Sequence, residues 1–101
     1  MRYGKLVRDR IPEIIEKNGD KAKTYMANEK EYSEKLEEKL KEEVDEFIKD
    51  KNEKELVDIL EVVYAIAELK SISKEKLELL RKSKAEERGG FKKRIILEET
   101  E

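Results

Sequence analysis

The sequence predicts an all-α fold: a helical bundle of two long antiparallel helices plus short helices, with an extended C-terminal tail, completed by dimerisation. Apolar residues recur at helical spacing along most of the chain. Asparagine or serine precedes each of the three longer helical segments, at the position of an N-cap. Charged residues make up 50% of the 101 residues and hydrophobic ones 37%, which leaves a thin core and favours association between chains. We expect a single domain over residues 1–101.

The first half of the chain predicts a short helix and then a long one. Pro12 suits a first helical turn, and the short helix "PEIIEKN" follows, up to Gly19. Three isoleucines are expected to face inward: Ile11, Ile14 and Ile15. Residues 22–27 alternate enough to be extended. Asn28, with Glu31 three residues later, resembles a capping pair, and the apolar spacing that follows predicts a helix to about Asp50.

The second half predicts two more helices and the tail. After the turn "KDKNEK", Asn52 opens a helix to about Lys70 that is apolar on most sides. Ser73 caps a fourth helix, which Gly89 and Gly90 end. The tail "FKKRIIL" is expected to be extended and to lie against the bundle.

Composition excludes several kinds of chemistry. The chain has no cysteine and no histidine, so thiol catalysis, thiolate metal sites and histidine bases are all absent. Its 24 basic and 26 acidic residues nearly cancel, which gives no general attraction to nucleic acid or membrane. The longest apolar run, "VVYAIA", is far shorter than the ~20 residues of a membrane span. The start "MRYGKLVRDR" lacks the apolar core of a secretory signal, so we expect a cytoplasmic protein.

Four acidic residues fall where the helical pattern calls for apolar ones. On a helical wheel, Glu55 and Asp58 share the arc of Val62 and Ile66, whereas Glu61 falls on the exposed strip. Each long helix carries one such pair at i, i+3, and antiparallel packing across the turn brings the pairs together. The pairs are Glu43 with Glu46 and Glu55 with Asp58. Four carboxylates at the edge of a core repel one another unless a cation lies between them, and oxygen ligands suit Mg²⁺, with Mn²⁺ as the alternative.

Simpler interpretations stay open at this point. In a chain with 26 acids, a pair at i, i+3 is often a solvated helix face. Glu55 also fits a capping box with Asn52. Nearby lysines could neutralise the acids in ordinary salt bridges; they are Lys41, Lys49 and Lys54.

The acidic segments resemble those of a known superfamily. "EEVDE" (42–46) followed by "ELVD" (55–58) is similar to the EExxE…ExxD signature of the all-α nucleoside triphosphate pyrophosphatases, which include MazG, dimeric dUTPases and phosphoribosyl-ATP pyrophosphohydrolase. "KLVRDRIPEII" and "ERGGFKKRIIL" resemble the phosphoribosyl-ATP pyrophosphohydrolase-like or MazG-like house-cleaning enzymes within it. True phosphoribosyl-ATP pyrophosphohydrolases carry a histidine soon after the second acidic motif. This chain has none there, which argues against the histidine pathway.

The resemblance implies Mg²⁺-dependent cleavage of the α–β phosphate linkage of a nucleoside triphosphate, giving a monophosphate and pyrophosphate. It implies Mg²⁺ ligation by Glu43, Glu46, Glu55 and Asp58, with Glu42 as the leading acid of the motif and Glu42, Glu43 and Glu46 as the catalytic acids. It also implies a homodimer or a higher homo-oligomer. Bases near both ends are then candidates to bind the phosphates: Lys5, Arg8, Arg10, Lys84 and Arg88, beside the amides of Gly89 and Gly90.

A function of another class fits the same sequence. A non-catalytic helical module would bind a partner protein through an apolar helix face, with the acids as structural salt bridges. It predicts no Mg²⁺-dependent change in melting temperature. Nucleic-acid binding is disfavoured, because no helix carries a basic stripe.

Overall fold

A computed structural model of the chain describes residues 4–101 and shows four helices in the order α1 (Ile11–Lys17), α2 (Glu29–Asp50), α3 (Glu53–Leu69) and α4 (Lys74–Arg88). No strand occurs in this part of the chain. The predicted all-α class is therefore confirmed. No helix among the described residues is long and apolar enough to cross a bilayer.

The helix starts follow the capping residues that the sequence indicates. The side chain of Asn28 accepts a hydrogen bond from the backbone N–H of Glu31 at 2.9 Å, and Ser73 accepts one from the N–H of Lys76 at 3.1 Å. Asn52 bonds the N–H of Lys54 at 2.8 Å. These bonds satisfy donors that have no partner inside the helix, and so fix where each helix begins.

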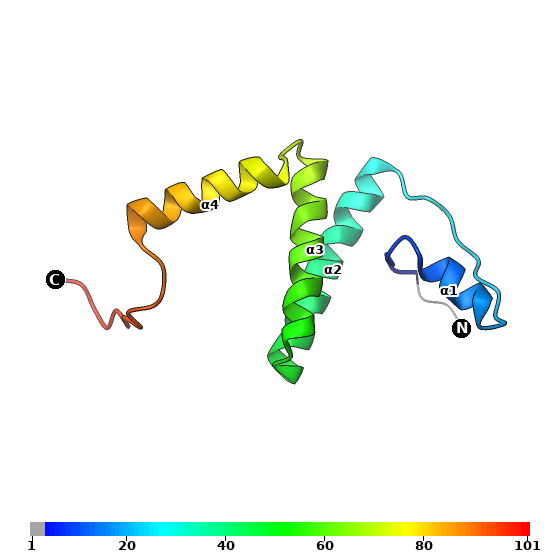
Figure 1. Cartoon of the computed structure of the whole chain (residues 1–101), viewed down its shortest axis with the longest axis horizontal. Helices are drawn as coiled ribbons and strands as arrows, with labels where there is room; N and C mark the ends of the chain where they lie inside the picture. The colour runs from blue at the N-terminus through cyan, green and yellow to red at the C-terminus, as the bar shows by residue number, and fades with distance from the viewer. Residues whose placement is uncertain (1–3) are drawn as a thin grey trace.

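Helices α2 and α3 form an antiparallel hairpin, which is the centre of the molecule (Figure 1). Lys51, with the left-handed φ of 57°, ends α2, and Asn52 begins α3 directly after it, so the two helices fold back on each other. Three hydrophobic side chains are buried among the described residues: Leu36, Val62 and Ala67. All three lie on this hairpin, and one acid, Glu43, is buried with them.

The rest of the chain extends away from the hairpin. Helix α4 contacts α3 near its start and then runs outward, and α1 packs against no other helix (Figure 1). The radius of gyration is 17.9 Å, against about 13 Å for a compact chain of about 100 residues. One chain on its own is therefore an open arrangement of helices.

Two sequence predictions fail because of this open arrangement. The tail was expected to lie against the bundle, but Phe91 is 97% exposed and Ile96 is 82% exposed. The tail follows the far end of α4, where no other helix of the same chain is within reach (Figure 1). The isoleucines of α1 were expected to face inward, but α1 has no helix to face: Ile14 is 48% exposed, and Ile11 and Ile15 are only half-buried.

Candidate metal centre

The hairpin brings three of the four predicted acids together. Glu43 of α2 and Glu55 and Asp58 of α3 each present a carboxylate oxygen, and these three oxygens lie within 4.8 Å of one another. We call these three residues the acidic cluster. Because α3 starts directly after α2 ends, the first turns of α3 lie beside the last turns of α2. The short turn thus places the cluster at one end of the hairpin.

Glu43 is the most unusual member of the cluster. It is 6% exposed, and its Oε2 atom is buried with no hydrogen-bond partner among residues 4–101. Its Oε1 atom lies 3.4 Å from Nζ of Lys39, one helical turn away. Burial raises the pKa of the Glu43 carboxyl above its ordinary value of 4.5, the carboxylates of Glu46 and Asp58 raise it further, and Lys39 offsets part of the rise. A buried carboxylate oxygen without a partner is costly, and a cation would remove that cost.

Glu42 and Glu46 flank the cluster on α2. Glu46 is half-buried and close enough to Glu43 to raise its pKa, although it is not one of the three mutually close acids. It makes no ion pair within residues 4–101. Glu42 pairs with Lys5 at 3.3 Å and with Lys39 at 3.8 Å. Glu46 therefore lies beside the cluster without an ion pair among the described residues, whereas Glu42 is held in ion pairs at the edge of the cluster.

The N-terminal segment supplies bases to this site. Nη2 of Arg8 donates to Oδ1 of Asp58 at 2.8 Å, across 50 positions of sequence. Nζ of Lys5 donates to Oε1 of Glu42 at 3.3 Å. Arg10 instead pairs with Glu13 of its own segment at 3.4 Å and is 78% exposed. Of the three predicted N-terminal bases, two lie at the acidic site and one does not.

The bases and glycines predicted near the other end lie elsewhere. Lys84 and Arg88 belong to α4, which runs away from the hairpin from the end opposite the cluster (Figure 1). The N–H of Gly89 donates to the carbonyl of Ala85 at 2.7 Å, so this amide caps the helix and is not open to a phosphate as expected; Gly90 follows it, fully on the surface. Within one chain these four residues do not join the site.

Two of the simpler interpretations of the acids, the capping box and the lysine salt bridges, can be compared with the structure. Asn52 bonds the N–H of Lys54, and the carboxylate of Glu55 lies in the cluster, so a capping role does not account for that carboxylate. The lysines expected to neutralise the acids, Lys41, Lys49 and Lys54, form no ion pair in the described part of the chain. Lys39 does so, and its position four residues before Glu43 is a signal that the sequence contained.

The donor set fits a hard divalent cation. Carboxylate oxygens are the ligands that Mg²⁺ and Mn²⁺ prefer, and helices hold all three clustered residues in place. Oε2 of Glu43 is an independent sign, because it is a buried acceptor that no donor among residues 4–101 reaches. Glu43, Glu55 and Asp58 are therefore the residues able to hold such an ion, with Glu46 beside them.

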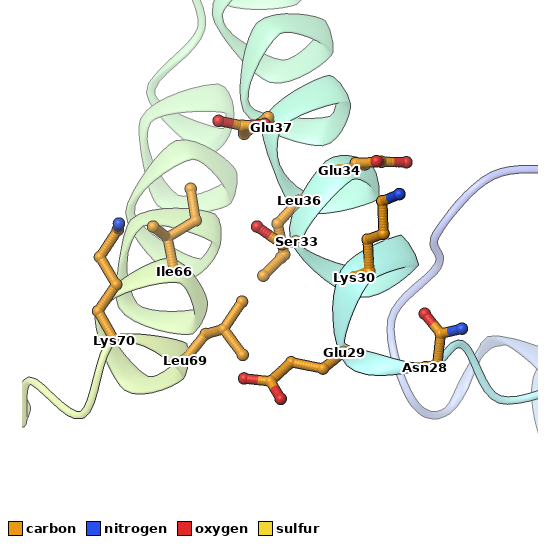
Figure 2. Close-up of a pocket in the computed structure, with 10 residues that line it drawn as sticks. All are labelled: Asn28, Glu29, Lys30, Ser33, Glu34, Leu36, Glu37, Ile66, Leu69 and Lys70. Atoms are coloured by element: carbon orange, nitrogen blue, oxygen red, sulfur yellow. The ribbon is translucent and has the colours of Figure 1, made fainter.

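A separate hollow lies at the opposite end of the hairpin (Figure 2). Leu36, Ile66 and Leu69 give it an apolar floor, and charges of both signs surround it, including Glu29 and Lys70. None of the clustered acids lines it. The hollow is therefore distinct from the acidic cluster, and its mixed rim favours no ligand of one charge.

The fold and the site together define a helical hairpin that carries a carboxylate cluster between its two long helices. Comparisons of the chain with protein-family models, with curated proteins and with solved structures found no match. An activity can therefore be argued only from the geometry of the site and from the motif resemblance.

Proposed function

We propose that the chain is a Mg²⁺-dependent nucleoside triphosphate pyrophosphohydrolase that cleaves the α–β phosphate linkage in nucleotide-pool house-cleaning. The observation that supports it most is Glu43, a buried carboxylate that meets Glu55 and Asp58 and leaves one oxygen without a donor. Lys5 and Arg8 beside these acids add the positive charge that a triphosphate needs. The same region carries the acidic motif that resembles the pyrophosphatases.

The chain's own residues divide the work in this proposal. Glu43, Glu55 and Asp58 hold the metal ion, which when bound neutralises phosphate charge and lowers the pKa of a water. Glu46, which makes no ion pair among the described residues, is placed to accept the proton of the attacking water. Lys5 and Arg8 orient the phosphates, because their side chains are 47% and 53% exposed and keep donors free.

We include a homo-oligomer in the proposal, because one chain leaves much apolar surface bare. Leu56, Val57 and Leu60 lie on one face of α3 and are 51%, 63% and 48% exposed. Ile48 near the end of α2 is 57% exposed. Burying such a side chain from full exposure stabilises by about 1.5–3 kcal/mol, and these half-exposed side chains would each gain about half of that, so a second copy on this face would supply the core that one chain lacks. A cytoplasmic location remains part of the proposal.

The experiment that tests the activity is a hydrolysis panel of common and damaged nucleoside triphosphates with Mg²⁺. Pyrophosphate and single phosphate are scored separately. The proposal expects pyrophosphate and a nucleoside monophosphate from one or a few members, and no single phosphate. Asp58→Asn serves as the inactive control, and Glu61→Gln, on the exposed side of α3, serves as the active one.

The exposed apolar face also favours a second candidate, a non-catalytic module that binds a partner protein. In that case the acids are scaffolding, and Mg²⁺ with a non-hydrolysable triphosphate leaves the melting temperature unchanged. If no triphosphate in the panel is hydrolysed and the melting temperature is unchanged, this candidate is favoured over the enzyme.

A further inference from the structure

The N-terminal segment is joined to the hairpin by polar contacts at the metal centre. Helix α1 packs against no other helix, and none of its side chains is fully buried, although Ile11 and Ile15 are half-buried. The contacts are Lys5 with Glu42, Arg8 with Asp58, and Nζ of Lys35 donating to the carbonyl of Gly4 at 2.9 Å. Two of these three contacts end on acids of the site.

The two ion pairs among these contacts are partly exposed, and such pairs exchange partners readily. The side chains of Arg8 and Asp58 are 53% and 38% exposed, and those of Lys5 and Glu42 are 47% and 34% exposed. Exposed ion pairs contribute only about 0.2–1 kcal/mol. The segment can therefore leave the acids whenever a stronger cation arrives.

The two bases carry as much charge as one divalent ion. Arg8 uses a single nitrogen on one oxygen of Asp58, and Asp58 is also one of the three residues whose oxygens lie within 4.8 Å of one another. A guanidinium on that carboxylate competes with a metal ion for it. Once displaced, Arg8 keeps five N–H donors in a fork that matches a phosphate.

We propose that Arg8 is an internal counter-cation of the metal centre: it holds Asp58 until a divalent ion binds, and the displaced guanidinium then binds the phosphate of the incoming ligand. This inference rests on the proposed function. It goes further than that function, because binding of the metal ion releases Arg8, and Arg8 then recognises the phosphate. Arg8 thus weakens the binding of the metal ion and strengthens the binding of the phosphate ligand.

The test measures both ligands on the intact chain by isothermal titration calorimetry, for wild type, Arg8→Ala and Arg10→Ala. Arg10 is the matched control, because it is an arginine of the same segment paired within that segment. With Mn²⁺ alone, Arg8→Ala binds about two- to five-fold more tightly than wild type, the upper value being about 1 kcal/mol. With saturating Mn²⁺, the same variant binds a non-hydrolysable triphosphate about tenfold more weakly. Arg10→Ala changes neither affinity.

The outcomes separate this inference from the proposed function. A structural role for Arg8 would weaken both affinities or neither, so parallel changes overturn the inference while metal binding itself still stands. Equal Mn²⁺ affinity in wild type and Arg8→Ala overturns it as well. Absence of Mn²⁺ binding in all three proteins overturns the metal centre and this inference together. As an independent readout, Mn²⁺ without nucleotide should speed tryptic cleavage after Arg8, and an unchanged rate contradicts release of the segment.

Discussion

Replacing Glu43 by glutamine should have opposite effects on stability without and with a metal ion. In metal-free buffer the wild-type protein holds a buried carboxylate whose Oε2 has no donor. Glutamine keeps the size of the side chain, removes the charge, and can donate its amide N–H to the carboxylate of Asp58 or Glu55. The variant should therefore be more stable than wild type when the protein is metal-free.

The magnitude follows from two opposing contributions. An unsatisfied buried polar group costs about 1–3 kcal/mol. The variant also loses the ion pair with Lys39, whose side chain is 18% exposed. This loss costs up to about 1 kcal/mol and offsets part of the gain. The net gain of about 1 kcal/mol raises the melting temperature by about 4–8 °C for a domain of this size.

The stability advantage of Glu43→Gln over wild type should also depend on pH, and the direction of the pKa shift of Glu43 gives the sign of that dependence. Burial raises the pKa of Glu43 in the folded state above its ordinary value of 4.5. The folded state then binds the proton more readily than the unfolded state, so wild-type stability falls as pH rises through the raised pKa. The advantage of Glu43→Gln is therefore present above that pKa, and it disappears in acid, where the carboxyl is protonated in both states.

The assay is a thermal melt of wild type, Glu43→Gln and Glu61→Gln, with EDTA and with saturating Mg²⁺. At a hundred times its dissociation constant, the ion stabilises the wild type by about 2.7 kcal/mol. Glu61→Gln should respond as wild type does, whereas Glu43→Gln should lose most of the response. A metal-free variant that melts below wild type, or one that keeps the full Mg²⁺ response, refutes the reasoning.

Four further outcomes are expected. Asp58→Asn should abolish pyrophosphate release and keep the helical circular dichroism of wild type; turnover within tenfold of wild type would remove Asp58 from the ligand set. EDTA should stop hydrolysis and added Mg²⁺ should restore it, which a steady-state rate measurement checks, and hydrolysis that persists in EDTA contradicts a metal enzyme. Leu60→Lys should convert an oligomer to monomers in light scattering after size exclusion; an unchanged mass would place the interface elsewhere. Asn28→Ala removes the cap of α2 and should cost about 1 kcal/mol in a denaturant titration, whereas a change under about 0.3 kcal/mol would show that the cap is dispensable.

Local rules account for the parts of the fold that the sequence predicts well. Asn28, Asn52 and Ser73 all cap the helices that they were expected to cap, because a capping bond spans two or three residues and needs no tertiary context. The meeting of Glu43 with Asp58 also follows from local geometry, since a short turn and two helical periods fix which residues face each other.

The failures concern parts whose position depends on contacts between distant segments. The tail around Ile96 and the helix around Ile14 are apolar enough to seek a partner, but periodicity does not say which surface of which chain will cover them. The bases of α4 lie away from the acidic cluster within one chain for the same reason, because α4 contacts only α3 among the other helices and then runs outward. Predictions beyond one helical hairpin therefore need information on how the segments, or the copies of the chain, come together.

For the acidic cluster, the residue pattern indicates where the acids lie, and the structure adds which of their oxygens have partners. The i, i+3 spacing identifies Glu43 as an acid on an inner flank, but spacing alone does not separate a ligand from a salt bridge. In the structure, Lys39 reaches only Oε1 of Glu43, and no donor among residues 4–101 reaches the buried Oε2. An ordinary salt bridge therefore satisfies only one oxygen of this carboxylate. Arg8, which neutralises Asp58, comes from a segment held to the hairpin mainly at this site. The most buried acid thus keeps one oxygen without a donor among residues 4–101, and the half-buried Asp58 holds an exposed arginine, which is the charge distribution that the proposed cation site requires.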